Sequence, residues 1–180
     1  MPKHPLNIDP YAKPSREEDW GTKHPSRYEP KQQTIGNTQP QQRMRALVFT
    51  AASPSLGAGP TAITFDTKVF DTSGIWTTTK LTIPSTGKVS GTWQISGQIA
   101  WPASAAGTKR VTQIRKNGTT ILATNQFAPV AQVQIAPVQV LVNDPSAGDF
   151  YELVETQDSG GNLTIIGGQD QTFFQAIHLW

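Results

Sequence analysis

Apolar and polar residues alternate in short runs from Ala46 onward, and this pattern constrains the fold more than any other feature of the chain. In the clearest run, residues 93–101, tryptophan and isoleucine alternate with glutamine and serine. A period of two places successive side chains on opposite faces of a strand, and no stretch of ten or more residues shows a helical period instead. The runs that we expect to be strands are residues 46–51, 62–65, 80–83, 89–101, 110–116, 119–124, 130–142, 150–156, 162–166 and 172–180.

Turn signals separate these runs at intervals of about ten residues, as in sandwiches and jelly rolls. Asn117-Gly118 joins two runs and predicts a type I′ hairpin, and residues 159–162 (Ser-Gly-Gly-Asn) predict a second turn. The alternation shifts by one residue at 136–138, which suggests a bulge there, and Pro137 favours an edge strand. The sequence therefore predicts an all-β fold, a jelly-roll β-sandwich of about ten short antiparallel strands.

Residues 1–45 have a different composition and predict an extended, proline-rich arm and linker in front of the β-domain, residues 46–180. They hold 7 of the 14 prolines, which leave no room for a helical or strand period. With so few aliphatic residues, the arm cannot offset its ordering entropy by itself. It carries 8 basic and 5 acidic residues, a net +3, whereas the domain carries 7 basic and 8 acidic residues, a net −1.

Three large aromatic residues, Tyr11, Trp20 and Tyr28, are spaced along this arm. Aromatic rings bury a large area with few rotatable bonds, so they suit the anchoring of an extended segment to a partner surface. The alternative is a solvated linker in which the rings have no partner. We expect the arm to bind another protein, and these three residues to be its contacts.

Signs of catalysis and of cofactor or metal binding are lacking in the sequence. The absence of cysteine excludes disulfide scaffolds, thiolate metal sites and cysteine nucleophiles, and no nucleotide-binding or hydrolase motif occurs. We therefore expect no enzyme activity, cofactor or metal. The net charge of −1 on the β-domain does not suit a protein that binds nucleic acid. No apolar run approaches the roughly 18 residues of a membrane span, and we expect neither a membrane segment nor a secretory leader.

A family resemblance covers residues 46–180. Its features, in chain order, are residues 63–65 (Ile-Thr-Phe), 69–71 (Val-Phe-Asp), 74–76 (Gly-Ile-Trp), 81–84 (Leu-Thr-Ile-Pro), 87–93 (Gly-Lys-Val-Ser-Gly-Thr-Trp), the hairpin 114–119, residues 148–153 (Gly-Asp-Phe-Tyr-Glu-Leu) and the last strand, 172–180. Together they resemble the jelly roll shared by tumour necrosis factor-like proteins and the globular heads of complement-type collagenous proteins. Gly148, Asp149, Tyr151 and Leu153 match the family's Gly-Asp pattern, which opens a strand near the end of the domain.

The resemblance implies a homotrimer in which aromatic and aliphatic residues of one sheet are buried between subunits. We expect the last strand to turn Phe173 and Ile177 toward the core and Phe174, His178 and Trp180 toward a neighbouring subunit. The alternative is that both faces of this strand serve the core and its loop cover. Three copies of His178 near one axis would allow a bound ion, although a histidine satisfied by its own chain is the simpler interpretation.

With its few charges and its many Thr, Gln and Ala residues, the domain also resembles those of bacteriophage virion proteins. We therefore expect a homotrimeric capsid decoration (cement) or head-fibre protein, made in the host cytoplasm and located in the virion. Its arm would bind the major capsid protein or another virion protein. The alternative is a tail-fibre or spike module that recognises a host surface glycan or protein, with Trp76 and Trp101 as the aromatic contacts to test.

Overall fold

The structure is a computed structural model, and it describes residues 43–85 and 90–180 of the 180-residue chain. The described residues belong to one compact unit of the chain, residues 41–180. The predicted contacts of the arm, Tyr11, Trp20 and Tyr28, lie outside the described residues, so they stay predictions. Strand β1 begins at Arg45, one residue before the predicted start of the β-domain.

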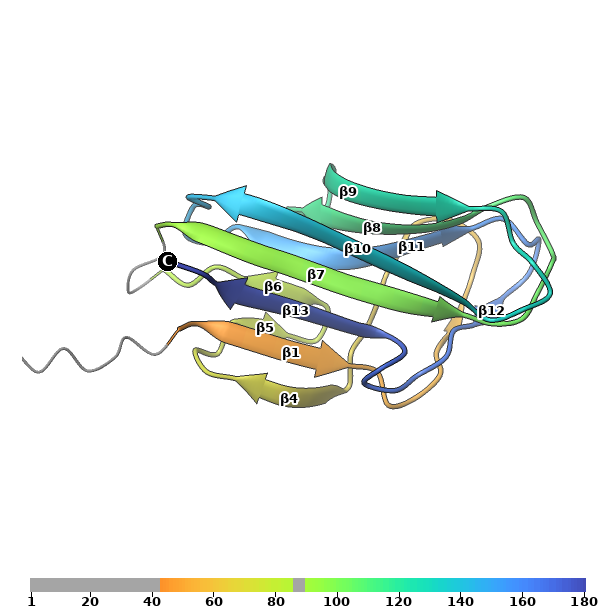
Figure 1. The fold of residues 1–180 in the computed structure, drawn as a ribbon, viewed down its shortest axis with the longest axis horizontal. Coiled ribbons are helices and arrows are strands. Elements are labelled where there is room, and N and C mark those ends of the chain that lie inside the picture. Colours follow the sequence, from red (N-terminus) through yellow and green to blue (C-terminus); the bar gives the residue numbers. More distant parts are fainter. Residues whose placement is uncertain (1–42, 86–89) are drawn as a thin grey trace, which may run out of the picture. The chain divides into compact units, whose positions relative to one another are not determined.

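Two antiparallel sheets face each other and form a β-sandwich (Figure 1). The first sheet has the order β10 (Gln134–Asn143), β7 (Thr92–Trp101), β13 (Phe173–His178), β1 (Arg45–Phe49) and β4 (Thr67–Asp71). The second has the order β5 (Trp76–Thr77), β6 (Lys80–Thr82), β11 (Phe150–Gln157), β8 (Arg110–Lys116) and β9 (Thr120–Phe127), with β3 (Thr61–Ala62) also pairing with β11. A short pair joins β12 (Leu163–Thr164) to β2 (Ser55–Leu56).

This architecture confirms the predicted all-β sandwich, and the described residues contain no helix. The sequence did not reveal β2, β4 and β5. Two of them have two residues each, too few to show a period. The third, β4, is an edge strand in which Val69 is 43% exposed, so its apolar residues do not mark a buried face.

The core lies between the sheets and is built by the alternation predicted for β7. Trp93, Ile95 and Trp101 have no exposed surface and pack in one cluster with Leu153 of the opposite sheet. Gly97 continues the same row without a side chain, and a Cβ there would lie 3.0 Å from the ring of Phe174. Because Gly97 has no side chain, it leaves a space in the core, and the ring of Phe174 on the neighbouring strand β13 fills this space.

The predicted orientation of the last strand is wrong. Phe174 is fully buried and stacks on Phe65 with the ring centroids 6.1 Å apart, whereas Phe173 and Ile177 lie half-buried on the outer face of the sheet. Neighbouring apolar residues at the end of the chain fit either phase of a period of two. The space above Gly97, which pairs with Phe174, decides the phase in favour of Phe174.

The predicted bulge at residues 136–138 is also absent. Strand β10 pairs with β7 in one unbroken register, with Pro137 opposite Gln98. Ala136 and Val138 face the core, and Ile135 and Leu141 lie exposed on the outer face. The proline does occupy an edge strand, as predicted, where the loss of one backbone N–H is tolerated.

The predicted hairpin between β8 and β9 is confirmed. Asn117 and Gly118 have φ of 52° and 77°, and the Thr119 N–H donates to the Lys116 carbonyl at 3.3 Å. Positive φ at both central residues is the geometry of a type I′ turn, whose twist matches that of the strands it connects. Within the described ranges there is also no helix long and apolar enough to cross a membrane.

Candidate functional site

The outer face of the first sheet is the most unusual surface of the domain, because its three strands on one side, β10, β7 and β13, hold no Asp, Glu, Lys or Arg. Their outward positions carry apolar and amide side chains instead, among them Phe173, Gln175, Gln94, Ile135 and Leu141. We call this surface, the outward residues of β10, β7 and β13 together with Leu47 and Phe49 of β1, the uncharged face. A soluble domain normally places charges on such an exposed sheet, so this face is suited to contact with another protein.

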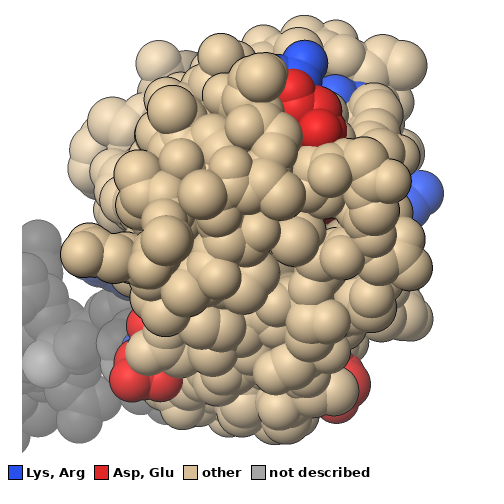
Figure 2. Space-filling model, turned by 90° about the vertical axis from the view of Figure 1, so that its right-hand side faces the viewer, with Lys and Arg blue, Asp and Glu red and all other residues tan. Residues whose placement is uncertain are grey.

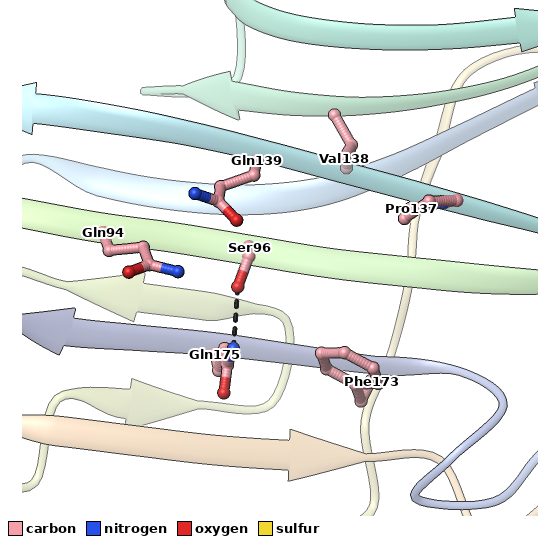
Figure 3. Close-up of a pocket in the computed structure, with 7 residues that line it drawn as sticks. All are labelled: Gln94, Ser96, Pro137, Val138, Gln139, Phe173 and Gln175. Atoms are coloured by element: carbon pink, nitrogen blue, oxygen red, sulfur yellow. Dashed lines mark hydrogen bonds between the residues drawn. The ribbon is translucent and has the colours of Figure 1, made fainter.

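A shallow pocket of about 310 Å³ lies in the middle of the uncharged face (Figure 3). It is lined by Gln94, Ser96, Pro137, Val138, Gln139, Phe173 and Gln175. The Gln175 amide donates to the Ser96 hydroxyl at 2.8 Å, which ties β13 to β7. The other two amides, together with the Phe173 ring, offer a neutral surface that both donates and accepts hydrogen bonds.

Apolar side chains flank this pocket on both sides. On the β10 edge, Ile135 and Leu141 are 43% and 56% exposed. On the other side, Leu47 pairs with Gln175 and Phe49 pairs with Phe173, so both point to the same outer face. The face ends in a charge at Arg45, whose guanidinium lies 4.8 Å from the centre of the Phe70 ring. Uncharged surface also dominates the end of the sandwich in Figure 2.

Of the three residues predicted for a subunit interface, none lies among the outward residues of this face. Phe174 is in the core, and the His178 ring stacks on Trp93 at 4.9 Å, with Nε2 3.0 Å from the Ser90 carbonyl oxygen. Trp180, at the end of the chain, is 73% exposed. The described part of the chain brings no three His, Asp or Glu residues together as a possible metal site.

The two tryptophans proposed as glycan contacts lie in different environments. Trp101 is fully buried, so it is not available to a ligand in this fold. Trp76 is half-buried and packs edge-on against Phe65, with ring centroids 5.6 Å apart. Neither residue is an exposed stacking platform for a sugar ring.

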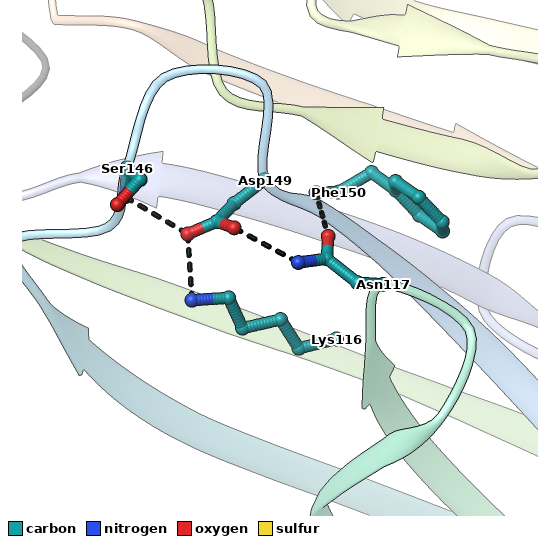
Figure 4. A network of polar contacts seen from close by, with 5 residues as sticks. All are labelled: Lys116, Asn117, Ser146, Asp149 and Phe150. Carbon is teal, nitrogen blue, oxygen red and sulfur yellow. Dashed lines mark hydrogen bonds and ion pairs between the residues drawn. The ribbon is translucent and has the colours of Figure 1, made fainter.

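The Gly-Asp motif holds two turns together (Figure 4). Gly148 has φ of 85° and leads into Asp149, whose carboxylate contacts Lys116 Nζ at 2.6 Å and accepts from the Asn117 amide at 2.9 Å. The same carboxylate accepts the Ser146 N–H at 2.8 Å. The motif therefore attaches the β8–β9 turn to the start of β11, and its next members, Tyr151 and Leu153, are fully buried in the core.

Asp149→Asn is expected to lower the free energy of unfolding by about 1–3 kcal/mol at pH 7. The reason is that the partly buried ammonium group of Lys116 loses the carboxylate with which it forms an ion pair. Burial raises the pKa of Asp149, but Lys116, Asn117 and the Ser146 amide outweigh it, and the pKa is lowered. A carboxyl group whose pKa is lower in the folded state than in the unfolded state stabilises the fold at pH values above its unfolded-state pKa. This stabilisation is lost as the pH falls through its folded-state pKa. Urea unfolding should therefore show a smaller difference between the two proteins near pH 3 than at pH 7.

The control for this prediction is Asp170→Asn, because Asp170 is exposed. Its effect should stay within about 0.5 kcal/mol at both pH values. An Asp149→Asn protein as stable as the natural one at pH 7 would contradict the role assigned to the motif.

Three further aspartates also hold loops in place. The Asp66 carboxylate accepts the Ala51 N–H at 2.7 Å, and that of Asp71 accepts the Ile75 N–H at 2.9 Å. The Asp158 carboxylate accepts the Thr108 and Lys109 N–H groups at 2.8 and 2.9 Å. These carboxylates are occupied in holding the fold together.

Comparison with known proteins shows the fold. No protein-family model matches the chain, and no curated protein sequence matches it either. Among solved structures, murine APRIL at pH 5.0 matches with a TM-score of 0.56 and 8% identity over 75% of this chain and 99% of that one. The globular domain of zebrafish complement 1qA matches with a TM-score of 0.57 and 11% identity over 77% of this chain and 98% of that one. The domain is therefore a jelly roll like those of tumour necrosis factor-type and complement globular-head proteins.

One signal of the uncharged face is visible in the sequence itself. Residues 92–101 and 134–143 are the two longest strands, and both lack any charged residue. The alternation predicted which side chains of β7 face outward, but not that β10 and β13 lie on either side of it. That pairing places the amides of Gln94, Gln139 and Gln175 on one surface.

Proposed function

We propose that this chain is a homotrimeric structural protein of a bacteriophage virion, a capsid decoration or head-fibre protein attached to the shell by residues 1–45. The observation that supports self-association is the uncharged face, which presents Phe173, Ile135 and Leu141 without any charge on β10, β7 or β13. The likeness in fold to APRIL and to the complement 1qA globular domain supports a subunit of this shape. The role is structural and requires no catalytic group.

A ring of three copies needs two different surfaces on each copy, since a contact between identical patches closes as a dimer. The uncharged face offers two such areas. One is the β10 edge with Ile135 and Leu141, and the other is the area around Phe173 and Phe49 on β13 and β1. In the proposed trimer the β10 edge of one copy packs against the Phe173 area of the next, and the amides around the pocket form hydrogen bonds across the contact.

The arm supplies attachment in this proposal. Ordering an extended segment costs about 1 kcal/mol or more per residue, so its contacts with the shell must exceed that cost. Tyr11, Trp20 and Tyr28 provide large rings for burial. Three arms on one trimer act together, because binding of the first raises the effective concentration of the others.

Deletion of residues 1–31 should leave a soluble assembled protein that no longer binds virus particles. The deletion removes all three aromatic anchors and leaves the β-domain intact. The measurement is sedimentation of the truncated and full-length proteins with particles that lack the protein. Decoration of the particles by the truncated protein would show that the arm is not the anchor. A matched control is the full-length protein with all three aromatic residues replaced by alanine, which should also lose binding.

A second candidate function is recognition of a host surface glycan, and the pocket in Figure 3 favours it. Neutral sugars bind through planar amides and an aromatic ring, and the pocket offers Gln94, Gln139 and the ring of Phe173. The two uses of this face exclude each other. A glycan array with the full-length protein separates them, because specific binding that is lost in Gln139→Ala would favour recognition over assembly.

A further inference from the structure

A polar cluster is buried between the two sheets, centred on Glu155. In the register of the second sheet, Glu155 of β11 pairs with Thr112 of β8 on one side and with Thr61 of β3 on the other. Residues that pair directly across strands point to the same face, and here that face is the interior. Glu155 and Thr112 have no exposed surface.

The carboxyl group of Glu155 has no hydrogen-bond partner among the described residues. Both carboxyl oxygens of Glu155 and the hydroxyl of Thr112 are buried without a hydrogen bond, and so is the indole Nε1 of Trp101. The Thr61 hydroxyl is near enough to lower the pKa of Glu155 somewhat, yet no hydrogen bond of good geometry joins them. Buried polar groups are nearly always paired, so a side chain with both oxygens unpaired requires an explanation.

The nearest cation is held elsewhere. Arg110 precedes Thr112 on the same face of β8 and is 1% exposed. Its guanidinium donates to the carbonyls of Lys109 and Ala106 at 3.0 and 2.7 Å and lies 5.6 Å from the Trp101 ring. It acts on Glu155 through its charge without forming an ion pair with it.

The surroundings of Glu155 are otherwise uncharged. Thr61 of β3 and Thr112 of β8, which pair with Glu155 on either side, carry no charge. Beyond the end of β11, Asp158 acts on Arg110, not on Glu155, and is exposed enough to lie in water. Arg110 is therefore the one charged group that bears on this carboxyl among the described residues.

An ionised carboxylate in such surroundings is unfavourable, since it loses its hydration and gains no hydrogen bond in return. Burial raises the pKa of Glu155 to about 7, and the effects of Thr61 and Arg110 offset only part of the rise. The neutral acid has no charge to desolvate, and it gains an O–H that can donate a hydrogen bond, which the carboxylate cannot do.

We propose that Glu155 is a protonation-sensitive element of the domain, whose neutral form lets the sandwich close and whose ionised form loosens the region where β3, β8 and β11 meet. The unfolded chain loses this proton near pH 4.5, whereas the folded domain keeps it to about pH 7. In that window the folded state binds more protons, so stability falls as pH rises. The domain would thus be most tightly closed in mildly acidic solution.

The test compares thermal unfolding of the full-length protein at pH 5.5 and pH 8.5, at one fixed concentration. We expect the natural protein to melt about 5 °C or more lower at pH 8.5, and Glu155→Gln to lose most of this difference. The matched control is Glu152→Gln on the same strand. The Glu152 carboxylate differs from that of Glu155 because it forms an ion pair, with Lys80 Nζ at 3.9 Å. This variant should retain the pH difference of the natural protein.

A second measurement on the natural protein does not depend on any variant. Carbon-13 NMR of the glutamate side-chain carboxyl groups should show one resonance that titrates near neutral pH, assigned to Glu155 by its absence in Glu155→Gln or by labelling. Titration of Glu155 below pH 5 would overturn the proposal, and so would an undiminished pH difference in the Glu155→Gln protein. If that variant does not fold, the titration of the natural protein decides.

Discussion

Phe173→Asp is expected to convert the assembled protein into single chains without unfolding them. Phe173 lines the pocket in the middle of the uncharged face and is only half-buried in one chain, so the monomer fold does not depend on its ring. In the proposed trimer the new carboxylate would be buried against uncharged residues of the next copy, at a desolvation cost that no partner offsets. Size-exclusion chromatography with light scattering gives the mass, and circular dichroism shows whether the chains remain folded.

The control for this prediction is Gln126→Asp, which places the same charge on an exposed strand position of the other sheet. That variant should keep the mass of the natural protein. If Phe173→Asp also kept it, the uncharged face would not be the contact between copies.

Phe174→Ala is expected to have the largest effect on stability, about 3–5 kcal/mol. The ring of Phe174 is fully buried, stacks on Phe65 and fills the space above Gly97, so its removal leaves a cavity that rigid strands cannot close. Urea unfolding at one fixed protein concentration measures the loss. The matched variant is Phe173→Ala, one residue away on the opposite face, which should reduce assembly more than the stability of the single domain.

These two neighbours together test the orientation of the last strand. A loss below about 1 kcal/mol for Phe174→Ala would contradict its place in the core. A large loss of stability for Phe173→Ala, measured in a solution dilute enough to contain single chains, would contradict the outward position of that ring. The opposite responses of adjacent residues follow directly from the period of two in a strand.

Local patterns in the sequence were sufficient where one feature decides the structure. Asn117-Gly118 predicted its turn because a type I′ turn needs positive φ at two successive residues, which few other pairs tolerate. The alternation in β7 predicted its buried row because tryptophan and isoleucine stand at every second position apart from Gly97. The resemblance also indicated the jelly roll, which the likeness to solved structures bears out.

The sequence was insufficient where the answer depends on contacts between distant segments. The phase of β13 depends on the space above Gly97, which lies far away in the chain. The step at residues 136–138 suggested a bulge because an apolar alternation that ends at Pro137 is followed by one that starts at Val138. The residues of the first alternation, such as Ile135, in fact lie exposed on the outer face, where polar residues were expected. Both errors have one origin, since the outer face of this sheet is apolar as well as the inner one. The same property that misled the prediction of the strand faces marks the candidate site.

The mass of the natural full-length protein in solution tests the central claim most directly. Light scattering during size-exclusion chromatography at micromolar concentration measures it without any variant. Our account predicts a single species of about three times the chain mass of 19.5 kDa, because three uncharged faces close into one ring. A single species at 19.5 kDa would contradict the account.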